Sequence, residues 1–400
     1  MNKRNGVVAG RFESPVSLEG LAGPATERIW LGRSLGERVE WSFMEAGIEF
    51  RDEGPLPEDR GRFLIRSDVA VTRDAVTAFA DAVGTTDARW EVGGRLGNFV
   101  ADLSFGDDGP WLVYLAPGGP VTPERIAQAE PLTMDSKERL LEFPLSEDHH
   151  GASMVELPIS DRLLMPTSHW LQLLWANLLG LGPFLWRNLM GSNILQVALR
   201  GAWAAMKAGS LQPQRVGGQL GRTGKRCKIH PSAVVEGSWL GDDVEVGANA
   251  VVRGSVLAAG TSVEDLAMVE FSVLGPGARV QRQAMVKYSV LGPRSAVGGL
   301  MQLGTLDRSA ALKRTGVLMD VSFGQGVRVE SDGRLHPAPL DMAGVCVGAG
   351  STVGAGVSIA AGRAVPAGVQ IVPSPDSLLM RIPSDIEGLV AVEDGTLRRL

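Results

Sequence analysis

A repeat of fixed length between Val235 and Gln302 constrains the fold of this chain more than any other feature. The stretch divides into four consecutive segments of 17 residues, which read VEGSWLGDDVEVGANAV, VRGSVLAAGTSVEDLAM, VEFSVLGPGARVQRQAM and VKYSVLGPRSAVGGLMQ. Each segment begins with Val and carries Ser three positions later. A constant period of this size is the signature of a repeat architecture, in which every unit stacks on the next.

Three apolar positions recur in each segment. The first is the initial Val, the second is a Leu followed by Gly or Ala, and the third is a Val at 246, 263, 280 and 297. Their spacing of five or six residues predicts three short faces per coil, with equivalent side chains stacked into one aliphatic core. The small residue after each Leu lets the chain turn at a corner. The sequence therefore predicts a parallel β-helix.

These motifs resemble the hexapeptide-repeat family, whose repeat is an aliphatic residue followed by Gly at six-residue spacing. The chain shows strict six-residue steps at Val347, Val353, Ile359, Val365 and Ile371. The resemblance covers residues 229–375 and implies a left-handed parallel β-helix that associates as a homotrimer. Members include acyltransferases, sugar-nucleotide pyrophosphorylases and purely structural proteins, so the family implies a fold more strongly than a function.

Residues 1–158 alternate strand-like and helix-like patterns, which favours an α/β domain with a parallel sheet. Expected strands lie at 7–10, 63–69, 111–116 and 140–145, and expected helices at 31–43, 75–83 and 121–129. We expect the helix over 31–43 because Leu31, Leu35, Val39 and Phe43 follow at steps of four.

This domain resembles, in reduced form, that of the sugar-nucleotide transferases, on the segments Leu21 to Pro24 and Glu45 to Ile48. It departs from that family where Arg11-Phe12-Glu13 replaces a run of glycines. A phosphate cradle needs glycines because backbone N–H groups must approach the ligand closely. The resemblance implies a degenerate or repurposed nucleotidyltransferase domain, with Asp68 as the candidate ligand of Mg²⁺. The alternative is that Asp68 caps the following helix, a role for which Thr72 competes.

Residues 159–228 form a basic connector with an unusual composition. No Asp or Glu occurs between Arg162 and Val235, whereas nine Lys or Arg residues do. The apolar stretch is too short to span a bilayer, and it predicts two amphipathic helices joined at 180–183. Tryptophan-rich helices with basic flanks are typical of membrane interfaces, which makes the connector a candidate membrane-surface segment. The candidate contacts are Trp170, Trp175, Trp186, Arg187 and Arg200. The alternative is that the helices are internal, covering the sheet or joining subunits.

The stretch 304–342 does not follow the repeat, and we expect it to be an inserted loop on the binding face of the β-helix. Its only histidine, His336, is the candidate general base for acyl transfer, supported by Asp320. Arg308, Lys313 and Arg314 are candidate ligands for the phosphates of acyl-coenzyme A or a nucleotide sugar. The alternative for His336 is a surface residue after a hairpin whose turn lies at 331–333.

The leading functional hypothesis is a transferase that moves an acyl or nucleotidyl group to a sugar, lipid or cell-envelope precursor. The alternatives are a non-catalytic membrane-associated scaffold and a sugar-nucleotide pyrophosphorylase. Two cysteines make no disulfide framework, and the N-terminus has no signal-like apolar run, so we expect a cytoplasmic protein, peripheral on the inner membrane face at most. No nucleic acid is expected as a partner, and 376–400 is expected to be a tail.

Overall fold

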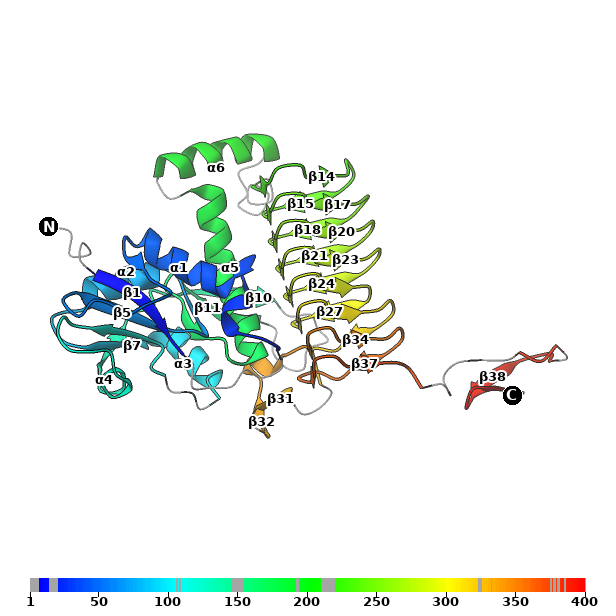
Figure 1. Ribbon diagram of the computed structural model, residues 1–400. Helices are drawn as coiled ribbons and strands as arrows, with labels where there is room; N and C mark the ends of the chain where they lie inside the picture. Colours follow the sequence, from blue (N-terminus) through cyan, green and yellow to red (C-terminus); the bar gives the residue numbers. More distant parts are fainter. Residues whose placement is uncertain are drawn as a thin grey trace.

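The computed structural model consists of an α/β domain and a parallel β-helix that lie side by side (Figure 1). The fold class expected from the sequence is confirmed. The structure describes residues 7–13, 21–105, 107, 109–144, 154–191, 194–209, 220–322, 326–331, 333–374, 376, 379, 382–384 and 386–399.

The main sheet of the α/β domain is mixed, whereas the alternating pattern favoured a parallel one. Its strand order is β4-β1-β5-β8-β7-β9, and β8 runs antiparallel to both neighbours. The strands are β1 (Val7–Phe12), β4 (Glu49–Phe50), β5 (Gly61–Arg66), β7 (Ala88–Val92), β8 (Leu112–Leu115) and β9 (Glu130–Met134). Of the four expected strands, 7–10 and 111–116 lie in this sheet, and 63–69 does so only as far as Arg66, where β5 ends.

Helix α1 (Leu35–Glu45) begins at a capping box, in which Ser34 and Glu37 exchange side-chain and backbone hydrogen bonds. This cap excludes Leu31, which lies in the preceding turn with a positive φ of 49°. Helix α2 (Arg73–Ala82) is capped by Thr72, not by Asp68. The remaining short helices of the domain are η1 (Ala25–Glu27), α3 (Gly94–Asp102) and α4 (Pro123–Ala127).

Two-stranded sheets lie around this core and lead into the connector. They pair β2 (Ile29–Trp30) with β3 (Arg33–Ser34), β6 (Val69–Val71) with β12 (Leu164–Pro166), and β10 (Arg139–Pro144) with β11 (Met154–Ile159). β10 corresponds to the strand expected over 140–145, although it lies outside the main sheet.

The connector contains two helices, but they do not meet at 180–183. Helix α5 (Trp170–Met190) is continuous through Gly180 and Pro183, and α6 (Ile194–Ala208) follows after Gly191. The expected break was wrong because α5 is packed into the core along most of its length, and that packing tolerates an internal proline. Residues 210–219 of the expected connector lie outside the described residues.

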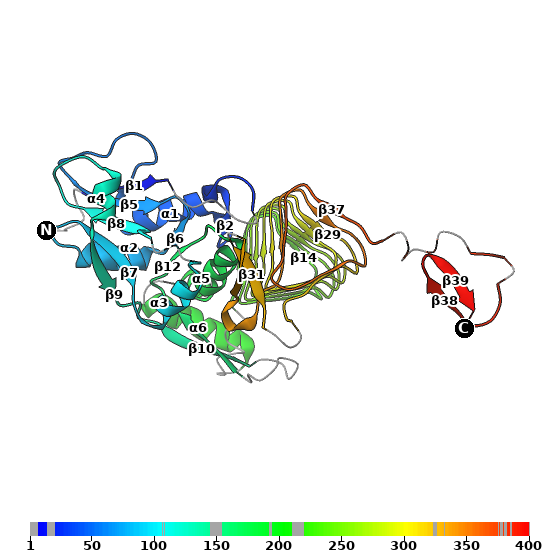
Figure 2. The same ribbon diagram turned by 90° about the horizontal axis from the view of Figure 1, so that it is seen from below.

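The β-helix has three parallel sheets, and Figure 2 shows its three sides in cross-section. We call the first the covered sheet, formed by β13 (Arg222–Thr223), β16 (Trp239–Leu240), β19 (Val256–Leu257), β22 (Val273–Leu274), β25 (Val290–Leu291), β28 (Thr305–Leu306), β33 (Cys346–Val347) and β36 (Ala364–Val365). The polar sheet comprises β14 (Lys228–Ile229), β17 (Glu245–Val246), β20 (Ser262–Val263), β23 (Arg279–Val280), β26 (Ala296–Val297), β29 (Ala311–Leu312), β34 (Thr352–Val353) and β37 (Gln370–Ile371). The third sheet comprises β15 (Val234–Glu236), β18 (Val251–Arg253), β21 (Met268–Glu270), β24 (Met285–Lys287), β27 (Leu300–Gln302), β30 (Val317–Leu318) and β35 (Ser358–Ile359).

The initial valines of the repeat form one column, as the period predicts. Val235 pairs with Val252, Val252 with Val269, and Val269 with Val286. The next partner is Met301, only 15 residues beyond Val286, because the chain turns within fewer residues at Gly298 and Gly299. The inward valines and leucines of the coils form a continuous buried core.

The inserted loop was expected over 304–342, and these bounds were wrong. Strands β28, β29 and β30 continue the coil to Leu318, because Leu306, Leu312 and Leu318 keep the six-residue step without the usual Gly. The excursion therefore lies between β30 and β33. It contains the hairpin β31 (Arg328–Ser331) and β32 (Arg334–Pro337), then η2 (Pro339–Asp341). The hairpin turn was expected at 331–333, of which Asp332 lies outside the described residues.

The expected C-terminal tail carries a second hairpin, β38 (Val390–Glu393) and β39 (Thr396–Arg399), which stands apart from the β-helix in Figure 1.

Candidate functional site

The α/β domain packs on the covered sheet, and a cleft lies along this contact. Outward-facing Val256, Val273 and Val290 of that sheet are buried in the same apolar cluster as Ile29 and Leu31 of the α/β domain. Strand β2 lies against β22. The repeat explains the apolar side chains that point into the β-helix. The apolar side chains that point outward from the covered sheet are instead explained by their contact with the α/β domain.

Asn177 of α5 holds the wall of the cleft in place. Its side-chain oxygen accepts a hydrogen bond from the backbone N–H of Leu31 at 2.8 Å, and its amide donates to the carbonyl of Ile29 at 3.0 Å. Asn177 is fully buried, where an unpaired amide would be costly. This polar residue in an apolar helix therefore positions the segment that faces the β-helix.

The cleft between the two domains has a volume of about 700 Å³. Its lining includes six arginines and four carboxylates, so its charge is positive overall. The arginines come from both domains and are Arg28, Arg33, Arg38, Arg222, Arg294 and Arg308. The carboxylates are Glu27, Glu37, Asp242 and Asp307. No histidine occurs among the described residues that line it.

Two ion pairs cross one end of the cleft and join the domains. Arg28 lies 3.5 Å from Asp307, whose carboxylate also accepts a hydrogen bond from the Ala22 N–H at 2.8 Å. Arg308 lies 3.0 Å from Glu27. Burial lowers the pKa of Arg28, and Asp307 opposes this shift by attraction. Arg308, predicted from the sequence as a phosphate ligand, thus lies in the cleft.

Two stacked aromatic rings lie between two guanidinium groups beside the cleft. The guanidinium of Arg38 lies over the Phe184 ring at 4.5 Å, Phe184 stacks on Trp239 with centroids 5.0 Å apart, and Arg222 lies over Trp239 at 4.8 Å. Burial, and secondly the repulsion of Arg33, lower the pKa of Arg38 to about 10. The group stays protonated at neutral pH, and a neighbouring negative charge would raise its pKa again.

Two guanidinium donors of the cleft lack partners. Nε of Arg28 and Nε of Arg38 are buried and have no hydrogen-bond partner within the described part of the chain. Buried donors are nearly always paired in folded proteins, so these two atoms are exceptions, and both lie inside the wall of the cleft, closed off from solvent. Guanidinium groups pair most strongly with carboxylate and phosphate oxygens.

The other predicted phosphate ligands lie elsewhere. Lys313 and Arg314 are exposed at the corner between β29 and β30 and do not line the cleft. The structure therefore does not bring Arg308, Lys313 and Arg314 together.

The two candidate catalytic residues have different partners. The His336 ring, on β32, packs edge-on against Phe105 with centroids 5.3 Å apart. Asp320 accepts a hydrogen bond from Gln302 at 2.7 Å. Phe105 in turn packs on His169, whose Nε2 lies 3.1 Å from the carbonyl of Glu330. His336 thus lies in the contact between the excursion and the α/β domain.

The candidate metal ligand Asp68 is fully buried in an ion pair. Both of its oxygens contact Arg66, at 2.6 and 3.1 Å, and Arg66 also pairs with Asp107. Hydrogen bonding and attraction from Arg66 outweigh burial and lower the pKa of Asp107. No group of three His, Cys, Asp or Glu residues that could hold a metal ion occurs among the described residues.

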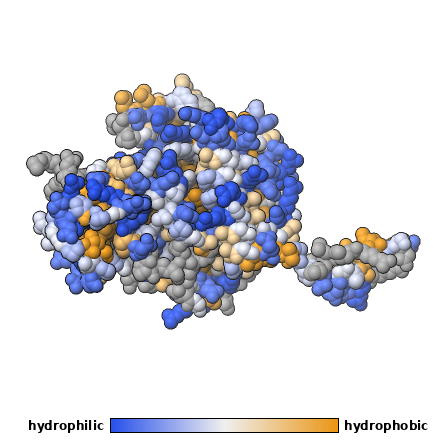
Figure 3. All heavy atoms as spheres, viewed as in Figure 1, coloured by the Kyte–Doolittle hydropathy of each residue, from blue (hydrophilic) through white to orange (hydrophobic). Residues whose placement is uncertain are grey.

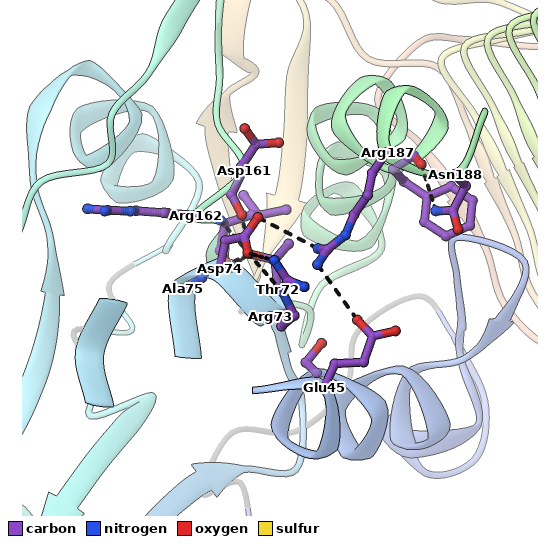
Figure 4. A network of polar contacts seen from close by, with 12 residues as sticks. Glu45, Thr72, Arg73, Asp74, Ala75, Asp161, Arg162, Arg187 and Asn188 are labelled. Carbon is purple, nitrogen blue, oxygen red and sulfur yellow. Dashed lines mark hydrogen bonds and ion pairs between the residues drawn. The ribbon is translucent and has the colours of Figure 1, made fainter. Parts of the chain in front are cut away.

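The candidate membrane contacts divide into two groups. Trp170 and Trp175 are 1% and 2% exposed and lie in the core, whereas Trp186 is 60% exposed. Arg187 lies 3.6 Å from Asp74 and 4.0 Å from Glu45, which ties α5 to α1 and α2 (Figure 4). Arg200 donates to the carbonyl of Leu189 at 2.8 Å. None of the described helices is both long and apolar enough to cross a bilayer.

Sequence reasoning missed most of the cleft. Arg28, Arg33 and Arg38 lie on a segment that shows only a helical pattern, and Arg294 lies on a coil corner. The only local signal was Trp239, the one aromatic residue in an outward position that holds Val in the following three repeats.

Comparison with known proteins adds little to this picture. No protein-family model matches the chain, and no curated protein sequence matches it. Among solved structures, a candidate acetyltransferase from Bacillus cereus is 16% identical, with 38% of this chain and 77% of that chain covered, at a TM-score of 0.17. That score is too low to support any inference about function.

Proposed function

We propose that the protein binds a small phosphorylated ligand in the cleft between its α/β domain and its β-helix. The observation that carries this proposal is the convergence of arginines from both domains on one cleft, two of them with unpaired buried Nε donors. A ligand with two or more phosphate oxygens would pair with both walls, and so would hold the two domains together.

Transfer of an acyl or nucleotidyl group is the second candidate, supported by the resemblance of the β-helix to transferases of the hexapeptide family. In that case the phosphorylated ligand is the donor, an acyl-coenzyme A or a nucleotide sugar. The pyrophosphorylase alternative has no geometric support, because β1 runs on as a strand through Arg11 and Phe12, where that family has its glycine loop.

Binding is tested by thermal shift and calorimetry with pyrophosphate, coenzyme A, ATP and UDP-glucose as probes. A ligand that binds the folded form raises Tm by mass action. Arg33→Gln and Arg294→Gln each remove one exposed guanidinium of the cleft, and Arg279→Gln is the control on the polar sheet. Loss of one charge-assisted hydrogen bond costs about 1.5–3 kcal/mol, so we expect roughly 10- to 100-fold weaker binding for the cleft variants.

The proposal is wrong if none of the four probes binds, or if Arg279→Gln weakens binding as much as the cleft variants do. Turnover of acyl-coenzyme A or of a nucleotide sugar that the cleft variants slow would extend the proposal to the second candidate.

A further inference from the structure

Helix α6 exposes a continuous apolar face to water. Leu195, Leu199, Trp203 and Met206 are 66%, 63%, 52% and 75% exposed. Their spacing of four, four and three residues places them on one side of the helix. In Figure 3 apolar atoms gather at the left end of α6, at the top of the molecule.

The opposite side of α6 fixes the orientation of this face. Ala204 is fully buried, and Val197 packs against the main apolar core. Gly201 lies so close to α5 that an added Cβ would be 3.7 Å from the terminal methyl of Met190. Small residues thus seat α6 on the protein, and its large apolar side chains point outward.

The charged residues of α6 itself are of one sign. Arg200 and Lys207 are the only charged residues in α6, and no acidic residue occurs between Arg162 and Val235. Arg200 contacts the carbonyl oxygens of Leu189 and Asn188, which carry no net charge, so its guanidinium remains a net cation beside the apolar face.

We propose that α6 is a membrane-docking helix that lies in the plane of an anionic bilayer surface, with Leu195, Leu199, Trp203 and Met206 inserted among the lipid headgroups. An apolar face with Trp, on a helix whose charged residues are all basic, matches the headgroup region and the negative charge of such a surface. A second copy of the chain fits less well. The four side chains offer on the order of 400 Å², about half of what each partner buries in a stable protein interface.

This surface differs from the one expected from the sequence. The expected contacts Trp170 and Trp175 are in the core, and Arg187 is paired with carboxylates. Of the earlier candidates, only Trp186 and Arg200 remain available to a lipid surface.

The experiment is co-sedimentation of the full chain with vesicles of phosphatidylcholine alone and with 30% phosphatidylglycerol, at low and high salt. We expect binding to the anionic vesicles at low salt, and at least tenfold weaker partitioning for the double variant Leu195→Ser, Leu199→Ser. Leu335→Ser, at a leucine that is 54% exposed on β32, is the matched control and should bind like the unchanged protein. All three leucines are exposed, and circular dichroism verifies that the variants fold.

Three outcomes would overturn the proposal: no sedimentation with anionic vesicles, equal loss in the Leu335 control, or unchanged binding of the double variant. Light scattering on the protein alone tests whether a second copy of the chain binds this face. Dimers that the double variant abolishes would assign the face to self-association instead. The result is independent of the cleft, since neither variant touches a residue that lines it.

Discussion

The covered sheet and the polar sheet of the β-helix have the same interior and opposite exteriors. Their inward residues are aliphatic in both, for example Leu274 in one and Val263 in the other. The outward neighbours are Val273, which is fully buried, and Ser262, which is partly exposed. The difference shows that the inward columns make the coil, whereas the outward column of each sheet decides what that sheet binds.

The largest expected effect comes from a charge placed on the covered sheet. Val273→Asp buries a carboxylate against β2 without a partner, and we expect it to reduce the free energy of unfolding by about 4 kcal/mol or more. Ala296→Asp also introduces an aspartate, on the polar sheet beside Arg279. It should change the free energy of unfolding by no more than about 0.5 kcal/mol. Urea denaturation measures the free energy of unfolding of both variants. Equal decreases would mean that the outer faces of the two sheets do not differ in burial.

A smaller effect is expected where the covered sheet meets α5. Trp239→Ala removes the ring that lies between Phe184 and Arg222. The stacking, the cation–π contact and the apolar area of Trp239 together predict that the free energy of unfolding falls by about 2–3 kcal/mol. Phe271→Ala removes a ring that stacks on Tyr288, another residue of the β-helix. If Phe271→Ala is the more damaging change in urea denaturation, the stack does not hold the domains together.

The smallest effect is expected from the ion pairs at the exposed coil corners. Asp265 accepts a hydrogen bond from the Ala248 N–H at 2.9 Å and pairs with Arg282 at 2.8 Å. These contacts, the backbone hydrogen bond foremost, lower its pKa below the ordinary 3.8. A lowered folded-state pKa means that the stabilisation is present above the unfolded pKa and is lost as the pH falls through the folded one.

Asp265→Asn should therefore lower Tm slightly at pH 7, and the difference from the unchanged protein should shrink below pH 3.8. Thermal melts at pH 7 and pH 3 measure it. A difference that grows as the pH falls would contradict the assigned sign.

Several elements of the α/β domain were predictable because their signals are local. Thr72 as the helix cap and the strand at 112–115 depend on neighbours in the chain. The direction of β8 was not predictable, since strand pairing depends on how the chain returns through space. The continuation of the coil past Gly304 was missed because stacking on neighbouring coils, and not the local Gly, keeps Leu312 and Leu318 in register.

The candidate site depended even more on packing. Arg308 was selected as a cation in a stretch that breaks the repeat, and it does line the cleft. Its neighbours Lys313 and Arg314 were selected by the same argument and lie on another corner. Trp170 and Trp175 were predicted to contact a membrane surface, but they are buried in the protein core. An apolar helix with tryptophans on one face shows the same sequence pattern whether that face meets lipid or a protein core.

By itself, the sequence determined the coil, because a constant period stacks identical side chains and needs only the next turn as its partner. Only the tertiary structure decided which side of the coil is covered, which tryptophans are buried, and that arginines from residues 28–38 and 222–308 share one cleft. Those features arise between segments far apart in the chain, where no local pattern records which surfaces meet.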